Sequence, residues 1–60
     1  MSKIQIEQKL TEMIEVYYKT TNFAERGNKF FEIVDWYNYL SEQNFKSDLM
    51  TVMQNIIVLG

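Results

Sequence analysis

The sequence predicts an all-α fold, namely a small three-helix bundle. Apolar residues recur every three or four positions in three successive segments, which is the spacing of one helical face. A residue that favours the N-terminal cap of a helix stands before each segment, and proline is absent from the chain. Because the 60 residues contain no linker, we expect a single helical domain over residues 1–60.

The first helix is predicted over residues 3–19. Ser2 is expected to cap it, and Gln5 stands three residues further on, where its side chain completes a capping box. The segment is amphipathic, with polar side chains on one side and an apolar stripe on the other. That stripe comprises Ile6, Leu10, Met13, Ile14 and Tyr17.

The second helix has a clear end and two alternative beginnings. Asn22 favours a cap directly before Phe23, and Glu25 stands where it would answer that cap. Gly27 argues for a later start, because glycine inside a helix costs about 1 kcal/mol relative to alanine. The main part is predicted over residues 29–42, and its apolar stripe comprises Phe30, Ile33, Val34, Tyr37 and Leu40.

The third helix is predicted from Asp48 to the last residue, with Ser47 as its cap. The carboxylate of Asp48 in the first turn suits the positive end of the helix dipole. The apolar stripe of this helix comprises Leu49, Val52, Met53, Ile56 and Ile57. From the three stripes we predict a core of Leu10, Ile14, Tyr17, Phe30, Val34, Tyr37, Leu49, Val52, Met53 and Ile56.

The composition argues against most catalytic and metal-binding chemistry. The chain has no cysteine and no histidine, which removes disulfides, thiolate metal sites and the commonest general base. The serines therefore lack a histidine partner, and carboxylate pairs such as Glu12 with Glu15 have the spacing of solvated charge on a helix surface. We expect no enzymatic activity, no catalytic residues, no cofactor and no metal.

Charge and hydropathy favour neither a membrane nor a targeting segment. The net charge is only −2, and the longest wholly apolar run, Ile56–Leu59, is far shorter than the roughly 20 residues of a membrane span. The first residues lack the apolar core of a signal peptide, so the default expectation is a cytoplasmic location. Five lysines, five asparagines and six isoleucines favour an AT-rich genome, such as that of a low-GC bacterium or its phage.

The third segment departs from an ordinary bundle helix. No side chain after Asp48 is charged, whereas a helix on the surface of a monomer normally carries charge on its outer face. Met50 and Val58 lie off the apolar stripe of this segment. One interpretation is a helix buried within a compact monomer. We favour burial across a subunit or partner interface, because an exposed apolar patch commonly marks a contact site.

The second segment departs in another way. Phe31 and Tyr39 fall outside its apolar stripe, among acidic and polar residues that include Asp35, and Trp36 lies at the flank. Large aromatic side chains of this kind are enriched among the residues that dominate binding energy at protein interfaces. The alternative is that Phe31 and Trp36 complete the core while Tyr39 is half-exposed.

These features predict a small non-enzymatic protein–protein interaction module that acts as an adaptor, inhibitor or regulator. Its partner-binding residues are predicted to be Phe31, Asp35, Trp36, Tyr39, Met50 and Val58. The partner is another protein or a second copy in a homo-oligomer, most simply a homodimer.

The alternative is a nucleic-acid-associated helical regulator. Residues 43–47 would then form the turn of a helix–turn–helix, and Lys19, Arg26 and Lys29 would form the basic footprint. Against it, the third segment has neither lysine nor arginine with which to contact phosphates or base edges. Nucleic-acid binding is therefore the less favoured function.

Overall fold

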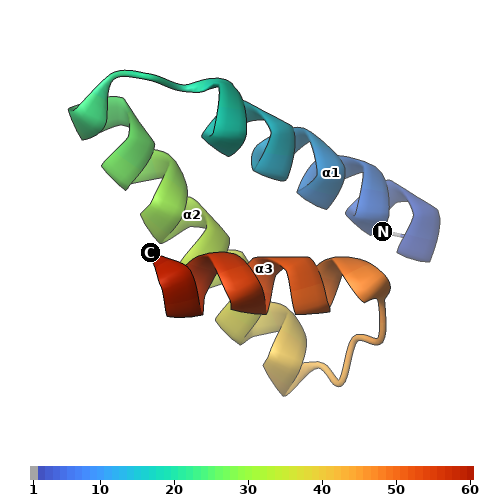
Figure 1. The fold of residues 1–60 in the computed structure, drawn as a ribbon. Helices are drawn as coiled ribbons and strands as arrows, with labels where there is room; N and C mark the ends of the chain where they lie inside the picture. Colours follow the sequence, from blue (N-terminus) through green and yellow to red (C-terminus); the bar gives the residue numbers. More distant parts are fainter. Residues whose placement is uncertain (1) are drawn as a thin grey trace.

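The computed structural model describes residues 2–60, and within them the predicted all-α fold is confirmed. Helix α1 spans Lys3–Lys19, α2 spans Phe23–Glu42 and α3 spans Asp48–Leu59, with no strand among these residues. In Figure 1, α1 and α2 diverge from their short connection, and α3 crosses α2. Helix α3 contacts both of the other helices, and its C-terminal end lies beside α2.

The three predicted caps are all formed. The hydroxyl of Ser2 accepts a hydrogen bond from the amide of Gln5, and the Gln5 side chain accepts one from the amide of Ser2. The side chain of Asn22 accepts a hydrogen bond from the amide of Glu25, and Ser47 caps α3 with its hydroxyl. Each cap satisfies backbone donors that have no partner inside the helix, which fixes where the helix begins.

Gly27 lies inside α2, which resolves the two alternative starts of this helix. The helix begins at Phe23 and continues without interruption to Glu42. The cap at Asn22 and the packing of the rest of the helix therefore outweigh the helical cost of one glycine.

The predicted core is confirmed in part: five of its ten residues are buried, four more are half-buried against them, and Met13, Ile33 and Leu40 are buried without having been predicted. Val34 is only half-buried and is not packed in the core cluster, whereas Ile33 is fully buried. The side of α2 that faces α1 and α3 is therefore centred on Ile33 and Leu40 rather than on Val34. The buried cluster comprises Leu10, Met13, Ile14, Tyr17, Ile33, Leu40, Met53 and Ile56.

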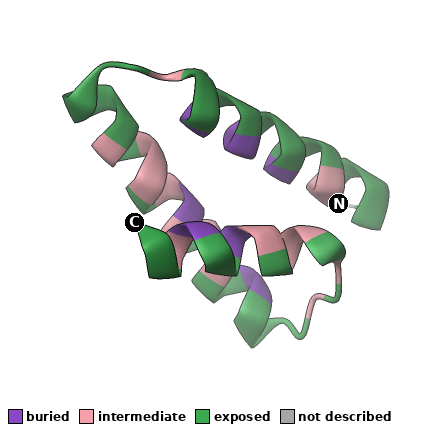
Figure 2. Ribbon diagram, in the orientation of Figure 1, coloured by how far each residue is buried: buried purple, intermediate pink, exposed green. Residues whose placement is uncertain are grey.

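The apolar stripe of α3 packs within the chain rather than facing outward. Met53 and Ile56 are buried, and Leu49, Val52 and Ile57 are half-buried against the same cluster. Figure 2 shows the buried positions on the sides of the helices that face one another. The lack of charge in α3 is thus explained in part by contacts inside the chain.

The connection between α2 and α3 is fixed by a left-handed residue. Asn44 has φ 58°, and its amide donates to the carbonyl of Ser41 at 3.1 Å. The amide of Phe45 donates back to the carbonyl of Leu40 at 3.0 Å. These two bonds form a Schellman motif, which turns the chain so that the side chain of Phe45 packs against the core.

Candidate protein interface

Three of the predicted interface residues lie together on the C-terminal half of α2. Asp35, Trp36 and Tyr39 line an open depression of about 330 Å³. The rings of Trp36 and Tyr39 are nearly perpendicular, with an angle of 87° between them and 6.1 Å between their centroids. Tyr39 is 56% exposed, while Trp36 is half-buried and rests on the core. Packing therefore holds Trp36 in place, while Tyr39 stays exposed and can contact a ligand.

A second depression shares these two aromatic rings. It has a volume of about 430 Å³, and its lining adds residues from α1 and from the connection after α2. The full lining comprises Ile6, Trp36, Tyr39, Leu40, Gln43 and Phe45. The Trp36–Tyr39 pair thus lines two depressions, one together with Asp35 and the other together with Gln43 and apolar side chains.

Sequence reasoning did not assign Ile6 or Phe45 to the interface. Phe45 lies in the break between two helices, where no helical periodicity places it. One signal was present, because an asparagine after a helix followed by a large apolar residue is the pattern of a Schellman motif. That motif directs Phe45 back toward α2 and next to Tyr39 in the lining of this depression.

Phe31 lies in a different place from Tyr39. Phe31 is 66% exposed and stacks edge-to-face on Phe30, with 6.0 Å between the ring centroids. Both rings line a depression of about 400 Å³ near the beginning of α2, together with Phe23 and Gly60. The predicted interface residues of α2 therefore line different depressions, with Phe31 in the first half of the helix and Asp35, Trp36 and Tyr39 in the second.

The two predicted residues of α3 are also separate from the Trp36–Tyr39 pair. Met50 is half-buried against the core and lines a different depression, which shares only Phe45 with the second depression of the aromatic pair. Val58 is 75% exposed near the end of α3. Neither residue lines the depression of Asp35, Trp36 and Tyr39.

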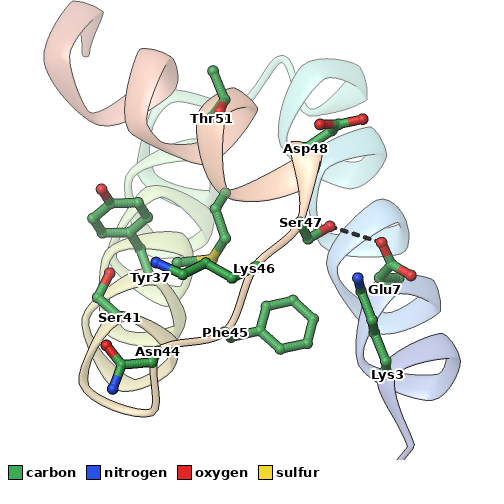
Figure 3. Close-up of a pocket in the computed structure, with 11 residues that line it drawn as sticks. Lys3, Glu7, Tyr37, Ser41, Asn44, Phe45, Lys46, Ser47, Asp48 and Thr51 are labelled. Carbon is green, nitrogen blue, oxygen red and sulfur yellow. Dashed lines mark hydrogen bonds between the residues drawn. The ribbon is translucent and has the colours of Figure 1, made fainter.

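The depression that Met50 lines is polar and has a volume of about 660 Å³. Figure 3 shows it between α1, the C-terminal end of α2 and the beginning of α3. Its one internal side-chain hydrogen bond runs from the hydroxyl of Ser47 to the carboxylate of Glu7, at 2.7 Å. The same hydroxyl accepts a bond from the amide of Leu49 as the cap of α3. Ser47 is therefore a structural residue, since its hydroxyl already joins α1 to α3.

The described part of the chain offers no cluster of acidic, histidine or cysteine side chains for a metal. Its three helices also include none with the length and hydropathy of a membrane span.

Two of the three basic residues near the first connection make contacts within the chain. The guanidinium of Arg26 lies over the ring of Tyr17, with its carbon 4.8 Å from the ring centroid. The ammonium of Lys29 lies 3.7 Å from the carboxylate of Glu32. The Tyr17 ring occupies one face of the Arg26 guanidinium, and the Glu32 carboxylate partly offsets the charge of Lys29. They weaken the basic footprint that the nucleic-acid alternative requires.

Comparison with protein-family models, with curated proteins and with solved structures found no match to this chain.

Proposed function

We propose that this chain is a non-enzymatic protein–protein interaction module that binds a larger protein through the C-terminal half of α2. Binding is stoichiometric, and the chain acts as an adaptor, inhibitor or regulator of that protein. The observation that supports this function is the aromatic pair Trp36–Tyr39, which is held on the core yet faces two open depressions.

The physical reason is that a held aromatic pair binds at low entropic cost. Trp36 is ordered by its packing before any partner arrives, so little side-chain freedom is lost on binding. Tryptophan and tyrosine supply large apolar areas with few rotatable bonds, which is why they are enriched among interface hot spots. Covering them removes apolar surface from water at about 25 cal/mol per Å².

The test compares capture of proteins from the source cell by the unaltered chain and by Tyr39→Ser. Loss of an anchor residue typically costs about 2 kcal/mol or more, which is roughly thirtyfold in affinity. We expect one protein to be retained by the unaltered chain and lost with Tyr39→Ser. Tyr18→Ser is the matched control, because Tyr18 is a tyrosine of similar exposure, 61%, on another helix, α1. Recovery of the same proteins by Tyr39→Ser would refute the proposed site.

A salt titration against generic duplex DNA tests the nucleic-acid alternative in the same preparation. Phosphate contacts make affinity fall steeply as salt increases. Because Arg26 and Lys29 are engaged within the chain, we expect no saturable binding at physiological salt.

A further inference from the structure

We infer that two copies of this chain associate by exchanging the ring of Phe23, which each copy places in a depression of the other. The depression lies at the first half of α2 and is lined by Tyr17, Phe23, Arg26, Gly27, Phe30, Phe31 and Gly60. It shares no residue with the two depressions that Trp36 and Tyr39 line, so this inference is independent of the proposed function.

Phe23 is the most exposed large apolar side chain in the described part of the chain. It is 93% exposed and is the first residue of α2, which begins at one tip of the molecule (Figure 1). A ring with this exposure contributes little to the core of its own chain. Leaving it in water forgoes about 25 cal/mol for each Å² of apolar surface that a contact would bury. The ring is therefore free to fill a depression on another molecule.

The depression beside Phe23 has room for such a ring. Its volume is about 400 Å³, and two of the residues that line it are glycines. A Cβ atom added at Gly27 would meet no other atom within 4 Å, so the space beside this glycine is open. The rings of Tyr17 and Phe30, whose centroids are 6.4 Å apart, offer aromatic contacts to an entering ring. The projecting ring and the depression thus lie on one surface, which is what a symmetric pair requires.

The chemistry of this surface favours a second copy over a charged partner. Arg26 is the one charged residue in the lining, and its guanidinium already lies over the ring of Tyr17. Leu59, which precedes Gly60 in the chain, is 85% exposed, and no side chain after Asp48 is charged. Interfaces between identical subunits are the more apolar class of protein interface. A second copy presents the same apolar residues and therefore matches this surface.

The exposed rings also supply a large part of the area that a dimer needs. A stable interface buries about 800 Å² of each partner, which is less than a fifth of the 4468 Å² that this chain exposes. A phenylalanine ring buries roughly 150–250 Å² when it is fully covered. Phe31 lines the same depression as Phe23 and is 66% exposed. Together the two rings provide roughly a third to a half of the area required.

The experiment compares self-association of the full chain with that of two variants, each of which removes one half of the exchange. Phe23→Ser removes the ring and keeps the depression, whereas Gly27→Leu keeps the ring and places a side chain in the open space of the depression. Neither substitution should unfold a single chain, because Phe23 is exposed and leucine favours a helix more than glycine does. Sedimentation velocity with a fluorescent tracer measures each dissociation constant, and circular dichroism measures helix content.

We expect each variant alone to self-associate roughly thirtyfold more weakly than the unaltered chain, which is typical of losing an interface anchor. An equimolar mixture of the two variants should associate more tightly than either variant alone, because the ring of Gly27→Leu can still enter the depression of Phe23→Ser. Tyr39→Ser is the control and should match the unaltered chain, since Tyr39 does not line this depression.

An unaltered chain that stays monomeric at high micromolar concentration would overturn the inference, as would unchanged self-association of Phe23→Ser. A mixture that associates no more tightly than its two components would also overturn it, because self-association would then not depend on exchange of Phe23. A monomeric chain that captures a cellular protein only when Phe23 is intact would assign the surface to a foreign partner and refute the exchange. Failure of the proposed function itself is read separately, from partner capture by Tyr39→Ser.

Discussion

Asn44 adopts a backbone conformation that costs most L-residues about 1–2 kcal/mol. Asparagine tolerates the left-handed region better than most residues, and glycine occupies it without a steric cost. We therefore expect Asn44→Gly to raise the free energy of unfolding slightly and Asn44→Ala to lower it by about 1 kcal/mol. Urea unfolding followed by circular dichroism measures both changes. Equal stability of the two variants would contradict the role assigned to this turn.

Gly27 offers the reverse case, a glycine in a position that does not need one. A Cβ atom added at Gly27 would have no neighbouring atom within 4 Å, and Gly27 lies inside α2. Alanine loses less conformational freedom than glycine on entering a helix. We expect Gly27→Ala to stabilise the protein by about 0.5–1 kcal/mol, visible as a higher thermal midpoint.

Gly60 provides the contrast to Gly27. A Cβ atom there would lie 2.5 Å from the ring of Phe30 and 2.9 Å from the carbonyl oxygen of Ile56. Gly60→Ala should therefore bring no gain in thermal midpoint. An increase equal to that of Gly27→Ala would show that the two glycines are not distinguished by their surroundings.

At the scale of the helices, local signals in the sequence identified all three elements, but they left the beginning of α2 open between Phe23 and a position after Gly27. Each helix begins after a predicted cap, because Ser2, Asn22 and Ser47 satisfy backbone donors through contacts only two or three residues away. The rotation of a helix about its own axis depends on contacts with residues far away in the sequence. The buried face of α2 was therefore predicted less accurately than its existence. Ile33 and Val34 lie 100° apart on an ideal helix, and only their contacts with α1 and α3 decide that Ile33 is buried.

The loop residue Ser47 joins elements that are far apart in sequence. Its hydroxyl accepts a hydrogen bond from the backbone of α3 and donates one to Glu7 of α1. We expect Ser47→Ala to cost about 1–2 kcal/mol of stability, because both bonds are lost. Ser2→Ala removes a cap without a link between helices, and should cost about 0.5–1 kcal/mol.

A double-mutant cycle of Ser47→Ala with Glu7→Ala isolates the link between α1 and α3. The expected coupling is about 0.5–1.5 kcal/mol, which is typical of one side-chain hydrogen bond. Additive effects of the two substitutions would mean that Ser47 acts through the cap of α3 alone.

At the scale of the whole molecule, the sequence identified residues of the candidate interface but not their grouping. Asp35, Trp36 and Tyr39 are four residues or fewer apart on one helix, so helical spacing alone brings them together. Their separation from Met50 depends on how α3 crosses α2, and the contribution of Phe45 depends on the left-handed turn at Asn44. Such long-range arrangements leave no periodic signal in 60 residues.

The exposed apolar side chains around Phe31 predict a homodimer. The chain exposes 4468 Å², whereas a monomer of 7.2 kDa exposes about 4,100 Å². Large apolar side chains are exposed at the beginning of α2 and at the end of α3, where Phe23 is 93% and Leu59 is 85% exposed. Phe23 and Phe31 line one depression with Gly60, so a second copy placed there would cover the first half of α2 and the residue that follows α3. A symmetric pair is the simplest such assembly, because one self-complementary surface serves both chains.

Sedimentation equilibrium at micromolar concentration tests this prediction. We expect the unaltered chain to sediment with twice the monomer mass and Phe31→Ser to shift it toward the monomer, since a serine removes the apolar ring from the surface that the second copy would cover. Tyr39→Ser is the matched control and should remain dimeric, because Tyr39 lines the depressions at the other end of α2. Circular dichroism of each variant confirms that the helices persist. A chain that sediments as a monomer at every concentration would show that the exposed aromatic residues near the beginning of α2 do not mediate self-association.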